Sequence, residues 1–127
     1  MAHTILIIED NPEIRDNLSE MLSLSGYSVI EAAHGKTGLE LAFEKLPDLI
    51  LCDIMMPEAD GYEVLKAIKM HPATSRIPFI FITSSVEPSQ IHIGLDMGAD
   101  GYVRKPFDEN ELYGEINTCL KKTEKKK

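Results

Sequence analysis

Residues 49–53 read LILCD, an apolar run that ends in a carboxylate, and residues 54–61 continue it with IMMPEADG. A continuous apolar run of this length is typical of a strand that is buried on both faces of a parallel sheet. Open α/β sheets bind their ligands at the carboxyl ends of such strands. The position of Asp53 therefore indicates a functional carboxylate as well as the end of a strand.

Short apolar runs alternate with segments of helical period on either side of this stretch. The predicted strands are 4–8 (TILII), 27–31 (YSVIE), 48–52 (DLILC), 78–82 (PFIFI) and 101–104 (GYVR). Apolar residues at helical spacing mark five helices between and after them: Ile14, Leu18, Met21 and Leu22; Leu39, Ala42, Phe43 and Leu46; Val64, Leu65 and Ile68; Ile91 and Leu95; Leu112, Ile116 and Leu120. The chain therefore consists of five strand–helix pairs.

Residues that start and stop helices support this division. Asn11 is placed to cap the first helix ahead of Pro12, and Gly26 suits its carboxyl end. The pairs Asp60 with Glu63 and Asp108 with Glu111 are typical capping boxes, and Gly98 suits the end of the fourth helix. Alternating strands and helices with right-handed crossovers favour an α/β three-layer sandwich around a parallel sheet.

Length and composition fit one domain. The 127 residues are 43% hydrophobic, which is enough to build a single core, and we assign residues 1–121 to it. Residues 122–127 are interpreted as a disordered basic tail or the start of a linker. Residues 121–127, KKTEKKK, carry five lysines and one glutamate, so the net charge of −8 leaves about −12 on the remainder. A body this acidic repels phosphate backbones, which argues against direct nucleic-acid binding.

The ends of the chain and its cysteines indicate a location. The N-terminus has neither a positive segment nor a long apolar stretch, and no later segment approaches the length of a membrane span. Cys52 and Cys119 fit neither a disulfide framework nor a zinc site and are interpreted as buried thiols. We therefore expect a cytoplasmic protein that does not interact with membranes.

Polar residues stand at the predicted carboxyl ends of four strands. They are Glu9 and Asp10 after the first strand, Asp53 after the third, Thr83 after the fourth and Lys105 after the fifth. All these ends meet at one edge of a parallel sheet, so the side chains should converge. Three carboxylates together require a cation among them or a proton on one of them. Hard oxygen donors favour Mg²⁺.

Lys105 and Thr83 add the groups that three acids lack. An ammonium is a point charge suited to a phosphoryl oxygen, and a hydroxyl donates a hydrogen bond to another. The combination indicates phosphoryl transfer with a carboxylate as the nucleophile.

These motifs resemble the receiver domains of two-component response regulators, including the chemotaxis regulators. The resemblance extends over about residues 4–121 and is carried by the acidic pair, by residues 53–61, by Thr83 with a small neighbour, and by residues 102–107 (YVRKPF). It implies a flavodoxin-like fold with strand order 2-1-3-4-5. It also implies a phosphoprotein of a phosphorelay, whose activity switches a protein-interaction surface.

The resemblance assigns a role to each matching position. Asp53 would accept the phosphoryl group from a phosphohistidine on a sensor histidine kinase or a phosphotransfer protein. Asp10, Asp53 and the backbone carbonyl of Met55 would bind Mg²⁺, with Glu9 helping through water. Lys105 would bridge to the phosphoryl group.

Further implied roles concern the switch. Thr83 would move toward the phosphoryl group and Tyr102 would swing inward after it, while the bond before Pro106 would be cis. The fourth helix, fifth strand and fifth helix, including Ile91, Tyr102 and Tyr113, would form a surface for partners or for a homodimer.

Alternative functions are less consistent with the residues. A phosphorylation-independent interaction module of the same fold would be expected to have lost Asp10, Asp53, Thr83 or Lys105. A flavodoxin-like flavin carrier needs a glycine-rich loop where this chain has residues 9–13, EDNPE. A dehalogenase-type phosphatase needs a general acid at the position of Met55, so we expect no turnover of outside substrates. The sequence does not name the kinase, the stimulus, the output, the oligomeric state or the phosphoryl lifetime, nor whether an effector domain follows Lys127.

Overall fold

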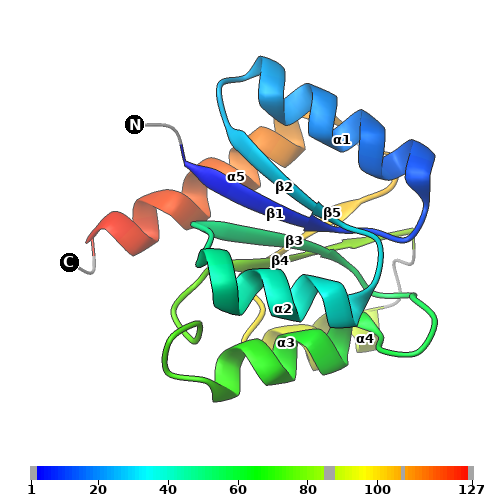
Figure 1. Cartoon of the computed structure of the whole chain (residues 1–127), viewed down its shortest axis with the longest axis vertical. Coiled ribbons are helices and arrows are strands. Elements are labelled where there is room, and N and C mark those ends of the chain that lie inside the picture. The colour runs from blue at the N-terminus through cyan, green and yellow to red at the C-terminus, as the bar shows by residue number, and fades with distance from the viewer. Residues whose placement is uncertain (1–2, 85–87, 107, 126–127) are drawn as a thin grey trace.

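The computed structural model describes residues 3–84, 88–106 and 108–125, with the backbone alone for 88–91 and 123–125. Strands and helices alternate throughout (Figure 1). The strands are β1 (Thr4–Ile8), β2 (Ser28–Ala32), β3 (Leu49–Asp53), β4 (Phe79–Thr83) and β5 (Gly101–Arg104). The helices are α1 (Pro12–Leu24), α2 (Gly35–Lys45), α3 (Gly61–Met70), α4 (Pro88–Asp96) and α5 (Glu109–Lys125).

The five strands form one parallel sheet in the order β2-β1-β3-β4-β5, which confirms the predicted fold. The chain moves outward from β1 to β2, and then returns to the other side of β1 to add β3, β4 and β5. The direction of winding therefore reverses between β1 and β3. Parallel sheets place their ligand crevice at this reversal, beyond the carboxyl ends of the two strands.

Alternate residues of each strand point to opposite faces of the sheet, and each face has its own core. Leu6, Ile50 and Phe81 lie on the face covered by α2, α3 and α4, while Ile7 and Leu51 face α1 and α5. Figure 1 shows α1 and α5 on one side of the sheet and the other three helices on the opposite side. Because both faces are covered, all five residues of β3 are buried, including its terminal acid.

Three strands begin and end one residue later than predicted. The sequence predicted 27–31, 48–52 and 78–82, whereas the structure has 28–32, 49–53 and 79–83. The parallel ladder continues through a polar residue at each of two carboxyl ends, because Asp53 pairs with Ile82 and Thr83 with Arg104. Asp53 and Thr83 are therefore the last residues of their strands, with backbones fixed by the sheet.

The predicted helix ends are largely confirmed. Asn11 caps α1 by accepting hydrogen bonds from the Glu13 and Ile14 amides, and Asp60 and Asp108 accept from amides at the starts of α3 and α5. Gly26 and Gly98 follow helices with φ of 94° and 107°.

The predicted tail falls partly within a helix. The backbone of α5 continues to Lys125, and residues 126 and 127 lie outside the described residues, as do Ser85 and Phe107 of the sequence motifs. In the described part of the chain, none of the helices is both long enough and apolar enough to cross a bilayer.

Candidate phosphoacceptor site

The sheet brings three carboxylates together at its carboxyl edge. Asp53 ends β3, and Glu9 and Asp10 follow β1, which is its neighbour in the sheet. Each of the three offers an oxygen, and these oxygens all lie within 4.8 Å of one another. Glu9 is completely buried and Asp53 is 5% exposed, so water screens their charges only weakly. The predicted convergence of the acids is present.

Lys105 supplies the cation that this cluster contains. It follows β5, and its amide donates a hydrogen bond to the Thr83 carbonyl, which fixes the start of its loop. Its Nζ lies 2.6 Å from Oε1 of Glu9 and 3.3 Å from Oδ1 of Asp53. The Lys105–Pro106 peptide bond is cis, the geometry that the family resemblance implied.

Burial and charge change the proton affinity of both central groups. Burial raises the pKa of Asp53 to about 7, and the negative charge of Glu9 adds to this effect while Lys105 opposes it. Burial alone would lower the pKa of Lys105, but its close contact with the Glu9 carboxylate and the charge of Asp53 raise it above its ordinary value. Lys105 therefore stays charged, and the charge state of Asp53 changes near neutral pH.

Glu9 is held at two points. Its Oε2 accepts a hydrogen bond of 3.1 Å from the Asn11 amide. Its Oε1 is buried and has no well-aligned hydrogen bond among the described residues, although the Lys105 ammonium lies next to it. A buried carboxylate oxygen with unused capacity, beside two further acids, is a donor set that suits a hard divalent cation. The residues present therefore fit a metal such as Mg²⁺.

Thr83 and Met55 lie at the same edge with different surroundings, and Tyr102 lies inside β5. Thr83 is 6% exposed and ends β4, immediately beyond the Ile82 that pairs with Asp53. The Met55 side chain is 73% exposed and points away from the core. Tyr102 belongs to β5 but packs on the α4 side of the sheet against Phe81, with ring centroids 5.4 Å apart. Tyr102 is therefore a neighbour of the site rather than part of the charge cluster.

Two residues support the site through contacts that were not predicted, although Gly61 belongs to the motif of residues 53–61. Nη1 of Arg15 donates a 2.8 Å hydrogen bond to the Glu9 carbonyl, and its Nε lies 3.9 Å from Glu31. Gly61 donates its amide to the Ile54 carbonyl at 2.8 Å, and a Cβ at this glycine would overlap the Asp53 carbonyl. Each fixes the backbone of a loop that carries an acid. Arg15 has no local sequence signal, and the motif that contains Gly61 does not indicate its contact, because both contacts depend on where a helix packs.

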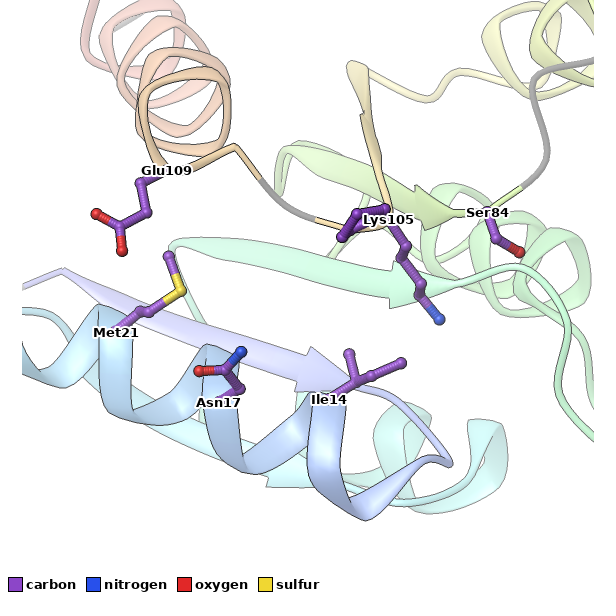
Figure 2. A pocket seen from close by; sticks show the side chains of 7 residues that line it. Ile14, Asn17, Met21, Ser84, Lys105 and Glu109 are labelled. Atoms are coloured by element: carbon purple, nitrogen blue, oxygen red, sulfur yellow. The ribbon is translucent and has the colours of Figure 1, made fainter.

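An open pocket of about 640 Å³ lies beside Lys105. Figure 2 shows Ile14, Asn17 and Met21 of α1 on one side, with Lys105 and Glu109 on the other. The lining also includes Pro106 and Ser84. The pocket therefore borders the charged site at Lys105 and runs along α1.

Comparison with known proteins is consistent with this geometry. The family model of the response regulator receiver domain matches residues 5–117. The chain belongs to the response regulator receiver domain family, and its fold and family are those of two-component signalling proteins. The recognition made from the sequence motifs is confirmed.

Individual members of the family show how similar this chain is to them in sequence and in structure. It is 37% identical to the DNA-binding dual master transcriptional regulator RpaA of Synechocystis, over 95% of this chain and 50% of that protein. The CheY-like receiver domain protein of Methanospirillum hungatei superposes with a TM-score of 0.90 at 30% identity, with all of both chains covered. Chemotaxis protein CheY4 of Vibrio cholerae gives 0.88 at 29% identity, with 94% of this chain and 99% of that chain covered. The chain spans about half the length of the curated relatives it matches.

Proposed function

We propose that this receiver domain accepts a phosphoryl group on Asp53 from a phosphohistidine of a sensor histidine kinase or a phosphotransfer protein. The observation that carries the proposal is the contact of Lys105 Nζ with both Glu9 and Asp53 at the edge where the strands end. A buried carboxylate in contact with a lysine that borders an open pocket is suited to nucleophilic attack on phosphorus.

The transfer is a substitution at phosphorus. A carboxylate oxygen of Asp53 forms the new bond to phosphorus while the phosphorus–nitrogen bond of the donor breaks, and the imidazole leaves with the bonding electron pair. Lys105 would neutralise a phosphoryl oxygen, and the hydroxyl of Thr83 would donate a hydrogen bond to another. Attack requires the ionised acid, so the raised pKa of Asp53 makes counter-charge necessary at neutral pH.

Glu9, Asp10 and Asp53 would hold Mg²⁺, together with the Met55 carbonyl implied by the family. The bound ion would supply positive charge that favours the ionised acid and offsets the charge of the phosphoryl group. Glu9 and Asp10 belong to one loop, which Arg15 and Asn11 keep in place.

The pocket along α1 offers a place for the donor to dock. Its lining combines apolar contacts from Ile14, Met21 and Pro106 with polar groups from Asn17 and Glu109. A helix that carries the phosphohistidine would lie in this pocket, next to Lys105, which contacts Asp53.

The proposal extends to the output surface. Phosphorylation would bias a surface formed by α4, β5 and α5, used for partners or for a homodimer. In support, α4 exposes Ile93 (52%) and Leu95 (45%). The side chain of Ile91 lies outside the described residues, and the Tyr113 hydroxyl donates to the Met21 carbonyl of α1, so Tyr102 is the better-placed aromatic residue.

The first test is covalent. The protein is incubated with acetyl phosphate with and without Mg²⁺, and its intact mass is measured. We expect one phosphoryl increment that requires Mg²⁺ and is lost in Asp53→Asn but kept in Asp16→Asn, an exposed acid on α1. An increment that survives Asp53→Asn, or no increment at all, would contradict the proposal.

The second test concerns assembly and turnover. Sedimentation with and without Mg²⁺ and beryllofluoride should show a larger species, or tighter binding of a partner, only with the phosphate mimic. We also expect no sustained hydrolysis of p-nitrophenyl phosphate, because no acid occupies the position of Met55. The cytoplasmic address and the absence of direct nucleic-acid binding remain predictions.

A further inference from the structure

Four aromatic rings form a cluster on the sheet face that α3 and α4 cover. Phe81 of β4 is its centre, with Phe79, Tyr62 and Tyr102 at centroid distances of 5.2, 5.3 and 5.4 Å. Tyr102 is the ring nearest α4, and burial raises the pKa of its phenol to about 12. The phenol thus sits in a partly enclosed space between the sheet and the helix.

Gly94 is the residue of α4 that faces this phenol. It is buried, and its neighbours Ile93 and Leu95 are exposed. A Cβ at Gly94 would overlap the Tyr102 hydroxyl oxygen, and would lie 2.8 Å from Cε2 of Phe81 and 3.0 Å from Cζ of Tyr102. The ring and any larger residue at this position therefore exclude each other.

The backbone at Gly94 is fixed by the end of the helix. The Ala99 amide donates to the Gly94 carbonyl at 3.0 Å and the Gly98 amide donates to the Leu95 carbonyl, with Gly98 at positive φ. This is the Schellman arrangement that closes many helices. The following loop is held in turn by a 2.7 Å hydrogen bond from the Asp100 amide to the Phe79 carbonyl. The helix is anchored here, so the ring is the part with more freedom to move.

We propose that Gly94 is a positioning residue: because it has no side chain, it admits the Tyr102 ring beneath α4, and a side chain at this position would displace the ring. Tyr102 of β5 pairs with Phe81 of β4 in the sheet, and Phe81 stands two residues before Thr83, the last residue of β4. The contact therefore lies between the phosphoacceptor site and the surface of α4. Its role in signalling rests on the proposed function, whereas the positioning itself does not.

The chain provides a matched control for the substitution. Gly114 lies inside α5, is exposed, and has nothing within 4 Å of an added Cβ. Alanine is the better helix former at both positions. Gly94→Ala and Gly114→Ala therefore make the same chemical change, and only the first has a steric consequence.

The positioning is tested on the full chain without phosphate, labelled with ¹³C at Cζ of its tyrosines. The Tyr102 resonance is assigned by its loss in Tyr102→Phe. We expect Gly94→Ala to move it toward the shift of an exposed tyrosine and Gly114→Ala to leave it in place. A Tyr102 resonance unchanged in Gly94→Ala would overturn the proposal.

A double variant decides the case in which Gly94→Ala folds poorly. Tyr102→Ala removes the ring that the new methyl group would meet. In that background, Gly94→Ala should no longer lower the melting temperature relative to Gly114→Ala. A loss of melting temperature that persists in the double variant would show that the ring contact is not the cause, and would overturn the proposal.

Coupling to phosphorylation is tested separately. With Mg²⁺ and beryllofluoride, the Tyr102 resonance should shift in the wild type and stay in place in Gly94→Ala. The rate of Asp53 phosphorylation by acetyl phosphate should change by less than about twofold, because the charged groups are untouched. An equal Tyr102 shift in both proteins would refute the coupling. If the wild type is not phosphorylated at all, the proposed function is wrong, but the test of Tyr102 positioning without phosphate is unaffected.

Discussion

At the scale of single residues, the site depends on the balance of charge around Asp53. Lys105 contacts Glu9 and Asp53, while Asp10 has an oxygen within 4.8 Å of both acids. The sequence predicted which residues meet, because the carboxyl ends of parallel strands share an edge. It did not predict that Glu9 would be wholly buried and Asp10 partly exposed, because that depends on how Arg15 and Asn11 hold the loop.

The raised pKa of Asp53 predicts a pH dependence of stability. In the metal-free protein its pKa is about 7, against an ordinary 3.8, so the folded state binds this proton more tightly than the unfolded state. This contribution to stability is complete below the ordinary value and is lost as the pH rises to about 7. Asp53→Asn lacks the loss, so its advantage over wild type should grow by about 2 kcal/mol between pH 5 and pH 8.

Urea unfolding in EDTA at the two pH values measures that difference. Asp16→Asn is the control, and its difference from wild type should stay nearly constant. An advantage of Asp53→Asn that is the same at both pH values would show that Asp53 titrates normally.

Removal of the Lys105 ammonium should also make the free energy of unfolding depend on pH. Lys105→Met keeps an unbranched side chain one atom shorter than lysine but leaves Glu9 and Asp53 without their cation. We expect a loss of about 2–4 kcal/mol in the free energy of unfolding at pH 8, and a smaller loss at pH 6, where a proton on Asp53 relieves the repulsion. Chemical denaturation measures it, with the exposed Lys121→Met as the control; a larger loss at pH 6 than at pH 8 would contradict this explanation.

At the scale of elements, polarity was a good guide to where strands end but not to the last residue. Two predicted strands end one residue before Asp53 and Thr83, although ladder hydrogen bonds depend on the backbone and continue through both. Leu46 shows a second limit. It caps the carboxyl end of α2 with φ of 47°, a conformation that favours glycine. Because the residue is leucine, its type did not predict the end of the helix.

Asn11 provides a test at this scale, because it ends the loop that holds the acids and caps α1. Its Oδ1 accepts from two amides, and its own amide donates to Glu9. Asn11→Ala should cost about 1 kcal/mol of unfolding free energy, and Asn11→Ser, which keeps an acceptor, should cost less. Urea midpoints at constant slope measure both changes; equal costs would mean that the cap does not contribute.

At the scale of the whole molecule, the sequence predicted the layers, and the family resemblance predicted the strand order. The hydrophobic pattern of the sequence did not show which helix covers which face of the sheet, because strands such as β3 and β4 are apolar on both sides. The reversal between β1 and β3 decides that question, and it also decides that Glu9, Asp10 and Asp53 share one crevice.

The cluster of Glu9, Asp10 and Asp53 predicts how Mg²⁺ affects the stability of the folded domain. A ligand that binds only the folded state stabilises it by mass action, and at one hundred times its Kd the gain is about 2.7 kcal/mol. Mg²⁺ at a saturating concentration should therefore raise the melting temperature of the wild type but not of Asp10→Asn. Scans at constant ionic strength exclude simple screening of the −8 net charge. An equal rise in both proteins would argue against the acidic cluster as the site.

The burial of β3 has a consequence for where motion can occur. The strand lies between β1 and β4, and all five of its residues are buried. Its amides should therefore exchange with solvent only when the entire domain opens, in either chemical state of Asp53. The strand that carries the modified acid therefore keeps its position, and the structural response to the modification must be a movement of loops and helices outside the central sheet.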